Sequence, residues 1–345
     1  MKRVVVDKPG GYERLQLKSY PMPQPEEGEV LIGCKACGVN FADCCVRMGI
    51  YRSAKVYEGW PITPGFEVSG EVLEVGENVN NYQVGDKVIA ITRFGGYTSH
   101  LVVPECQVFA LPKSMSFEEG AAFPGVFLTA YYGLIELTHP RPKSTILVHS
   151  AAGGVGSALV QLSKAIGCEV IGVVGSSEKV KFVEELGADA VIDKSTSNLW
   201  ENAERLAPKG FDVILDANGR ETLKEGYQHL APGGKIVVYG FHTMLSKGRG
   251  RPNWLKIVWN YLRTPRFNPL NLTTDNHGVL GFNLSYLFDK VDLFQEFINQ
   301  MFTWLDEEKI HPPTVTAYNL ENVAQAHKDL ESGKTVGKLV LLTSC

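Results

Sequence analysis

The chain has 345 residues, of which 44% are hydrophobic, and its formal net charge at pH 7 is −4. This length is typical of two domains, and a fold of this size buries roughly three quarters of its unfolded surface without disulfides or structural metal ions. The acidic balance excludes a globally basic nucleic-acid binder, and no apolar run approaches the ~20 residues of a membrane span. Seven irregularly spaced cysteines and the lack of an N-terminal apolar leader favour a cytoplasmic protein.

Short runs of alternating apolar and polar residues fill the first third of the chain. Turns rich in Gly, Pro and Asn separate these runs, which lie at residues 28–39, 66–76, 85–92 and 97–105. Several short strands at such spacing predict a β-barrel or a β-sandwich.

Four of the seven cysteines lie between Cys34 and Cys45. A zinc site usually adds a second cysteine pair or histidines at matching spacing, whereas here the second pair is adjacent in sequence and the next histidine is His100. Alternation along a strand through this segment would also point Cys34 and Cys37 to opposite faces. We therefore favour buried small side chains over a metal site.

The pattern changes near Phe117. Helical spacing begins there, and Ser116 with Glu119 predicts a capping box at the helix start. Buried strands then alternate with helices, the strands lying at residues 145–150, 168–175, 188–193, 211–219 and 234–240. This alternation predicts an α/β fold with a doubly wound parallel sheet. The last sixty residues return to mixed helices and strands.

A glycine-rich loop follows the first of these buried strands. The segment ILVHSAAGGVGSALVQL places Ala151, Gly153, Gly154 and Gly156 between a strand and a helix. That layout puts a pyrophosphate against the unpaired amides of a helix N-terminus, with glycines allowing close approach. A tight turn without a ligand is the simpler alternative, but the strand–loop–helix context favours a dinucleotide site.

Cofactor choice depends on the end of the next strand. A site for NADH would place Asp or Glu about twenty residues past the glycine motif to bind the ribose 2′-hydroxyl. No acid stands there, although Glu178 is close by. The residues that can donate to the 2′-phosphate of NADPH instead are Ser176, Ser177, Lys179 and Lys194. We therefore predict NADPH rather than NADH.

A barrel-like first part followed by this nucleotide fold resembles the medium-chain dehydrogenase/reductase superfamily over nearly the whole chain. Zinc alcohol dehydrogenases of that superfamily carry a Cys where Asn40 stands and a His where Phe66 stands, and they add a four-cysteine lobe that is absent after Thr92. The segments NFADCCVRMGIY, from Asn40, and Leu128–Tyr131 are similar to the zinc-free quinone oxidoreductase branch. The resemblance implies no zinc, and hence no metal at the opening cysteines.

Within that branch, GFNLSYL near Gly281 is most similar to the vesicle amine transport protein group, whose members are associated with membranes and lipid handling. The sequence departs from some relatives at Cys45 and Lys194, where tyrosines are common. The resemblance implies a GroES-like β-barrel catalytic domain at 1–124, completed by 288–345, and a Rossmann NADPH-binding domain at 125–287.

The resemblance also implies an activity and its residues. We expect hydride transfer from NADPH to a small electrophilic substrate, a quinone or an α,β-unsaturated carbonyl, with Asn40 and Tyr51 as catalytic candidates; packing is the alternative role of Tyr51. The alternative function is an NADPH-binding peripheral membrane or lipid-binding protein with little turnover. The expected cofactor-binding residues are Asn40, Thr129, Ala152, Gly153, Gly154, Val155, Gly156, Gly175, Ser176, Ser177, Lys179, Lys194, Tyr239, Gly240 and Phe282.

We assign Asp43 and Arg47 a structural pairing and no catalysis. Cys45 is predicted to be either a redox-sensitive thiol or, by preference, an inert buried one. An apolar segment late in the nucleotide domain, GVLGFNLSYL, predicts an edge strand that pairs with its copy in a homodimer.

A basic segment without any acid runs from Gly226 to Thr274. Its seven cations are Lys235, Lys247, Arg249, Arg251, Lys256, Arg263 and Arg266. Helical spacing puts Lys256, Asn260 and Arg263 on one face, beside several aromatic residues. Such a helix is typical of contact with an anionic membrane surface, here through 247–266. The alternatives are a substrate lid and a dimer contact; nucleic acid is not expected.

Overall fold

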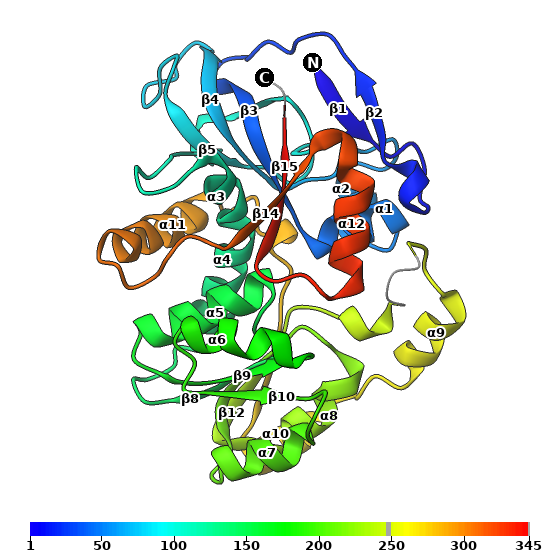
Figure 1. Cartoon of the computed structure of the whole chain (residues 1–345), viewed down its shortest axis with the longest axis vertical. Coiled ribbons are helices and arrows are strands. Elements are labelled where there is room, and N and C mark those ends of the chain that lie inside the picture. The colour runs from blue at the N-terminus through cyan, green and yellow to red at the C-terminus, as the bar shows by residue number, and fades with distance from the viewer. Residues whose placement is uncertain (246–249, 344–345) are drawn as a thin grey trace.

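The computed structural model describes residues 1–245 and 250–343, and two large sheets dominate the described chain (Figure 1). One sheet has seven strands, drawn from both ends of the sequence, and the other has six parallel strands from the middle. Lys247 and Arg249 of the basic segment lie outside the described residues.

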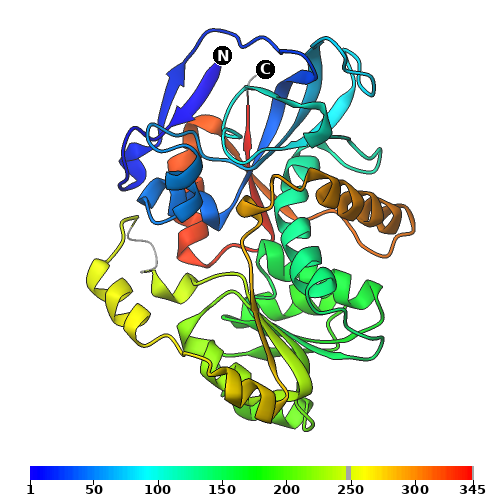
Figure 2. The same ribbon diagram turned by 180° about the vertical axis from the view of Figure 1, so that it is seen from behind.

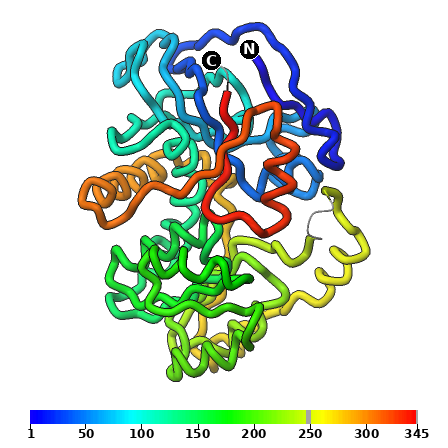
Figure 3. The backbone as a smooth tube through the Cα atoms, viewed as in Figure 1, coloured from blue at the N-terminus to red at the C-terminus, as the bar shows by residue number. Residues whose placement is uncertain are grey.

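The seven-stranded sheet has the order β14-β15-β3-β4-β5-β7, with β6 paired to β3. Its last strand in sequence, β15, lies between β14 and β3, as the red and blue tubes in Figure 3 show. A separate two-stranded sheet holds β1 (Lys2–Val5) and β2 (Gln16–Ser19). The strands of the large sheet are β3 (Glu29–Val39), β4 (Glu67–Val75), β5 (Lys87–Ile91), β6 (His100–Pro104), β7 (Val108–Ala110), β14 (Val315–Asn319) and β15 (Lys338–Leu342).

A β-bulge in β3 explains what becomes of the first two cysteines. The register against β4 shifts between Cys34 and Ala36. Because the extra residue reverses the alternation of faces, Val30 and Cys34 before the bulge share one core with Cys37 and Val39 after it. The expectation that Cys34 and Cys37 point to opposite faces was therefore wrong. Both thiols are fully buried.

The six-stranded sheet is entirely parallel and has the order β10-β9-β8-β11-β12-β13. The reversal of direction in the order occurs between β8 and β11, as expected for a doubly wound sheet. Its strands are β8 (Thr145–Val148), β9 (Glu169–Val174), β10 (Ala190–Asp193), β11 (Phe211–Asp216), β12 (Leu230–Val238) and β13 (Gly278–Gly281). The helices between successive strands from β8 to β12 are α5 (Gly154–Ala165), α6 (Val180–Glu185), α7 (Leu199–Leu206) and α8 (Arg220–Gln228).

Helices between the two sheets join them through one hydrophobic core (Figure 2). Ser116 caps α3 (Phe117–Ala122), where its hydroxyl accepts from Glu119 N at 3.2 Å while the Glu119 carboxylate accepts from Ser116 N at 2.8 Å. The predicted capping box is thus confirmed. The chain then continues through α4 (Pro124–Tyr131), whose Phe127 packs on Phe123 in this core.

The other α-helices of the described chain come from the two ends of the sequence and from the segment between β12 and β13. They are α1 (Phe41–Met48), α2 (Arg52–Tyr57), α9 (Trp254–Leu262), α10 (Pro269–Asp275), α11 (Val291–Asp306) and α12 (Val323–Ser332). Figures 1 and 2 show α9 projecting at one side, away from both sheets. Within the described ranges, none of the helices combines the length and the apolar character needed to cross a bilayer.

Candidate functional site

The carboxyl ends of the parallel strands meet at one edge of the sheet, and every predicted nucleotide residue of this sheet follows one of them. The glycine loop follows β8, Gly175 follows β9, Lys194 follows β10 and Phe282 follows β13. Tyr239 and Gly240 follow β12 in the same way. In doubly wound sheets, ligands bind at this edge near the reversal of strand order. The topology therefore brings these residues together at the carboxyl edge of the parallel sheet, where a ligand would bind.

The glycine loop has the geometry of an anion cradle. A Cβ atom on Gly156 would lie 2.2 Å from Ser150 O, so only glycine allows α5 to start this close to the strand end. The N-cap of α5 is Gly153, which offers no side-chain hydrogen bond to the first amides of this twelve-residue helix. Those amides and the helix dipole favour a phosphate group.

Two further observations are consistent with a nucleotide at this edge. Asn218, which follows β11, is 4% exposed, and its Nδ2 has no hydrogen-bond partner among the described residues. A Cβ on Gly175 would meet only Lys194 Cε, at 3.8 Å, so the backbone there is open to a ligand. A buried donor without a partner is costly unless a ligand or water supplies an acceptor. Asn218 was missed from the sequence, although it directly follows a buried strand at the predicted edge.

The end of β10 carries a carboxylate that was also missed. Asp193 accepts from the hydroxyls of Ser177 at 2.5 Å and Ser195 at 2.6 Å, and these hydrogen bonds lower the pKa of Asp193. The hydroxyl of Ser176 donates to Glu178 at 3.3 Å. Both serine donors predicted for the 2′-phosphate therefore already have carboxylate acceptors, whereas Lys194 lies beside them with an exposed side chain.

Lys179 occupies a different environment from the one its predicted role suggests. It is 8% exposed, and its ammonium donates to Gly333 O at 2.7 Å and to Thr335 O at 2.9 Å. This lysine thus ties the start of α6 to the loop before β15. Its role as a phosphate ligand stays a prediction.

Asn40 lies at the N-cap of α1 and is held by two charged side chains. Its Oδ1 accepts from Lys338 Nζ at 2.5 Å, and its Nδ2 donates to Glu67 Oε1 at 2.9 Å. The same Glu67 oxygen accepts from Lys338 at 2.6 Å. The position that carries a zinc ligand in alcohol dehydrogenases thus takes part in a buried Asn–Lys–Glu cluster. Lys338 was not identified from the sequence, because Glu67 is 271 residues away.

The backbone next to Lys338 touches the glycine loop directly. Gly337 N donates to Ala152 O at 2.9 Å, and Gly337 forms an isolated parallel bridge with Gly153. Gly337 has φ +64°, and a Cβ there would lie 2.3 Å from Thr314 O, so glycine is required. The structure therefore brings Asn40, from the first half of the chain, next to the predicted cofactor loop.

Tyr51 points its hydroxyl toward the segment after β13. The hydroxyl donates to Asn283 Oδ1 at 2.9 Å, one residue beyond Phe282. Burial raises the pKa of Tyr51, so its phenol stays protonated near neutral pH. Its ring packs edge-on against Phe66, with centroids 6.0 Å apart, and Phe66 in turn contacts Phe94. The position of the missing zinc-binding histidine is thus filled by an aromatic cluster.

Two other predicted residues lie on neighbouring elements. The hydroxyl of Thr129, in α4, donates to Gly125 O at 2.6 Å. The ring of Tyr239 stacks with that of Phe282 at 6.4 Å, and Tyr132 packs on the same phenylalanine at 5.0 Å. The contacts are compatible with the predicted cofactor roles and do not test them.

Arg47 and Asp43 do not pair, contrary to the sequence-based assignment. Arg47 is fully buried and donates to Glu331 Oε1 at 2.7 Å. The carboxylate of Asp43 accepts from the backbone N–H groups of Asn40 at 2.8 Å and Gly65 at 2.7 Å. Burial raises the pKa of Asp43 to about 7, against the opposing effect of these hydrogen bonds.

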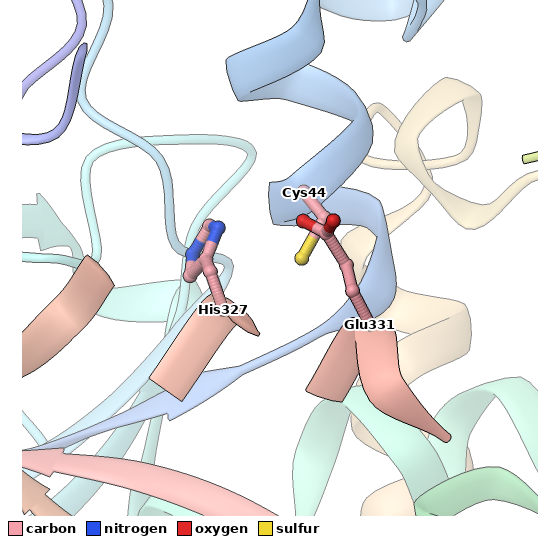
Figure 4. Close-up of side chains that lie close together, drawn as sticks. All are labelled: Cys44, His327 and Glu331. Carbon is pink, nitrogen blue, oxygen red and sulfur yellow. The ribbon is translucent and has the colours of Figure 1, made fainter. Parts of the chain in front are cut away.

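Cys44 belongs to a buried trio with His327 and Glu331, whose possible ligand atoms all lie within 4.8 Å of one another (Figure 4). The guanidinium of Arg47 reaches two of these three side chains, since its Nη1 also lies 3.4 Å from His327 Nδ1. The positive charge that a metal ion would bring is therefore already supplied by arginine. Burial also raises the pKa of the Cys44 thiol, which disfavours the thiolate needed for metal binding.

The second adjacent cysteine, Cys45, is only partly shielded, yet burial raises the pKa of its thiol to about 12. A thiol with this pKa reacts slowly with oxidants at neutral pH, because the thiolate is the nucleophile. This favours the inert assignment over the redox-sensitive one.

Comparison with known proteins identifies the family to which the chain belongs. Residues 26–113 match the pattern of an alcohol dehydrogenase GroES-like domain, and residues 154–285 match that of a zinc-binding dehydrogenase. The chain is 34% identical to the synaptic vesicle membrane protein VAT-1 homolog of Homo sapiens, over 96% of this chain and 84% of that protein. It is 32% identical to the quinone oxidoreductase of Lama guanicoe, over 99% of this chain and 97% of that protein. The structure of Escherichia coli quinone oxidoreductase complexed with NADPH superposes with a TM-score of 0.85 at 28% identity, covering 99% and 100% of the two chains.

A parallel nucleotide-type sheet with its glycine loop, joined to a GroES-like domain, defines a medium-chain dehydrogenase/reductase. The predicted fold class is therefore confirmed. The chain belongs to the quinone oxidoreductase branch of that family, close to the VAT-1 homologues. The resemblance inferred from the sequence is confirmed as well, while the domain boundaries and the roles of the site residues stay predictions.

Proposed function

We propose that the chain is an NADPH-dependent oxidoreductase that reduces a quinone or an α,β-unsaturated carbonyl without zinc. The observation that carries this proposal is the meeting of Asn40 with the glycine loop through Gly337 and Lys338. Support for the nucleotide comes from Escherichia coli quinone oxidoreductase, a family member solved with NADPH. Support for a zinc-independent reaction comes from Asn40 and Phe66, which replace two zinc ligands of the alcohol dehydrogenases.

When bound, NADPH supplies the hydride, and the oxygen of the substrate collects the negative charge. The protein contributes position and electrostatics. The amides at the start of α5 and the Asn218 side chain bind the nucleotide, and Lys194 provides a cation for the 2′-phosphate. Asn40, with one amide hydrogen left, lies on the first half of the chain as a hydrogen-bond donor for the substrate and the nicotinamide half. The Tyr51 hydroxyl donates to Asn283 in this structure, so it would donate to a substrate by exchanging that partner.

The experiment that tests this proposal is steady-state oxidation of NADPH against a panel of quinones, enones and aldehydes, with zinc measured in the same preparation. Turnover of quinones or enones by zinc-free protein is the expected result. Tight NADPH binding without turnover of any acceptor would refute an enzymatic role.

A second candidate function, membrane contact, is favoured by the exposed surface of α9. Two of the three residues of the predicted cationic face turn toward the protein, since Asn260 is 4% exposed and Lys256 Nζ donates to Leu245 O at 2.8 Å, whereas Arg263 is exposed. Arg263 stacks over Trp259, with its guanidinium carbon 4.3 Å from the ring centroid. The outward face is apolar and aromatic, formed by Trp254 (60% exposed), Leu255 (86%), Val258, Trp259, Tyr261 and Leu262.

An apolar aromatic helix face beside cations is suited to the interfacial region of a bilayer. We therefore expect co-sedimentation with phosphatidylserine-containing vesicles that is only partly lost at high salt, because insertion of rings is less salt-sensitive than charge contacts. A Leu255→Ser/Trp259→Ser variant should lose binding. Leu206→Ser, which changes an exposed leucine on α7, serves as the control. Wild-type protein that ignores vesicles of every composition would eliminate this second function.

A further inference from the structure

The ion pair formed by Lys338 and Glu67 is almost completely buried. The side chain of Glu67 is 0% exposed and that of Lys338 is 3% exposed. Burying two charges is unfavourable unless their geometry is good and their remaining hydrogen-bonding capacity is met. Both conditions hold here, since the ammonium and carboxylate are 2.6 Å apart and each has further partners.

The carboxylate of Glu67 is fixed from several sides. Its Oε1 accepts from Lys338 and Asn40, and its Oε2 accepts from the backbone N–H of Gly125. Glycines keep the space around it, because a Cβ on Gly38 would lie 2.3 Å from Oε1 and a Cβ on Gly125 would lie 2.8 Å from it. The carboxylate therefore has little freedom to move.

This arrangement determines which way the amide of Asn40 faces. An ammonium can only donate and a carboxylate can only accept, so Oδ1 must face Lys338 and Nδ2 must face Glu67. A flipped amide would place its NH₂ group against the ammonium and its oxygen against the carboxylate. One lone pair of Oδ1 and one hydrogen of Nδ2 remain for other partners.

Lys338 also connects this amide to the nucleotide loop. The preceding residue, Gly337, bonds to Ala152 and Gly153, and Lys338 Cδ would lie 3.5 Å from a Cβ on Gly154 at the start of α5. We propose that Lys338 is a positioning residue which, with Glu67, fixes the orientation and place of the Asn40 amide relative to the cofactor loop. The inference rests on the function proposed above. In this site without zinc, the buried ammonium of Lys338 would hold the Asn40 amide in place.

The test uses three variants of the full chain. Lys338→Met removes the charge and leaves Glu67 buried without its counterion. Glu67→Gln/Lys338→Met removes both charges and so retains the fold while still losing the polarity that orients Asn40. Lys338→Arg keeps the charge. Lys235→Met is the matched control, because Lys235 is a half-buried lysine whose ammonium donates to Thr138 O at 2.8 Å, away from the site.

Three measurements are made on each protein: the NADPH Kd by fluorescence titration without acceptor, kcat and KM with the best acceptor, and the Asn40 rotamer in crystals grown with NADPH. We expect kcat of the double variant to fall about a hundredfold, the effect of a misplaced group at a reacting centre. Its NADPH Kd should change by less than about threefold, because the orientation of Asn40 matters in the transition state rather than for binding of NADPH in the ground state. Lys338→Arg should recover most of the activity, and Lys235→Met should match wild type.

A folded double variant with wild-type kcat and an unchanged Asn40 rotamer would overturn the inference. So would an increase in the NADPH Kd with kcat unchanged, since Lys338 would then act on cofactor affinity. Failure of the proposed function would give a different result, because wild-type protein would then turn over no acceptor. The Asn40 rotamer in crystals of the wild type and of the double variant would still decide whether Lys338 positions Asn40.

Discussion

Cofactor selectivity gives the sharpest test of the nucleotide edge, and the substitution is Lys194→Ala. Lys194 follows β10 with an exposed side chain, next to the open backbone of Gly175. Only NADPH carries a 2′-phosphate, so loss of this cation should weaken NADPH binding and leave NADH binding almost unchanged. A charge-assisted hydrogen bond contributes about 1.5–3 kcal/mol, which corresponds to roughly tenfold to 150-fold in Kd. Because Lys194 is exposed to solvent, we expect the lower end, about tenfold.

The neighbouring carboxylate predicts an effect of opposite sign. Asp193 stays ionised at neutral pH, because hydrogen bonds from Ser177 and Ser195 lower its pKa, and a negative charge here repels the phosphate. Asp193→Asn removes this repulsion and keeps the side-chain volume, so it should strengthen NADPH binding and leave NADH binding almost unchanged. The same change also frees the Ser177 hydroxyl to donate to the ligand.

The assay is fluorescence titration of both nucleotides at 0.1 M and 1 M salt. Lys179→Ala is the comparison, since its ammonium holds the carbonyls of Gly333 and Thr335 and its loss should affect both nucleotides alike. Equal losses for NADPH and NADH in Lys194→Ala would refute this assignment. If Lys179→Ala weakened NADPH binding relative to NADH binding more than Lys194→Ala does, the buried Lys179 would be the residue that binds the 2′-phosphate.

Three other outcomes are expected. Arg47→Met should lower stability by about 3–5 kcal/mol in thermal unfolding, because it leaves the Glu331 carboxylate buried without a counterion; a melting temperature equal to that of wild type would contradict this. Sedimentation at micromolar concentration should give the mass of two chains, since β13 is the last strand of the parallel sheet and its outer edge is unpaired within the described part of the chain; a mass of one chain would count against pairing. Elemental analysis of protein purified without chelator should show far less than one zinc per chain, and stoichiometric zinc would disprove the metal-free site.

Local patterns in the sequence were sufficient for the parallel sheet and its nucleotide edge. The buried strands, the glycine loop and the Ser116 capping box each depend on residues a few positions apart, and the structure contains all of them. The same locality explains the errors. Asp43 and Arg47 are four residues apart on one helix, which suggested a pair, yet Arg47 bonds to Glu331, 284 residues away.

Long-range partners account for what the sequence could not indicate at the site. Lys338 lies in the apolar segment GKLVLL, which predicts a strand, and nothing local distinguishes its lysine from a solvated one. Its burial follows only when β15 lies beside β3 and Glu67 approaches from β4. The bulge in β3 is a similar case, because the shift that turns Cys37 inward is defined only by the register against β4.

The place of β15 inside the seven-stranded sheet, between β14 and β3, has a consequence for biosynthesis. The six strands of the parallel sheet lie between residues 145 and 281, so they can pair as soon as that part of the chain has left the ribosome. The seven-stranded sheet must wait for residues 338–342, although most of its strands are synthesised first. Until then Ala36–Val39 of β3 lack the strand that pairs with them, and a strand edge of this kind recruits chaperones or aggregates. The middle of this protein is therefore expected to fold before its beginning.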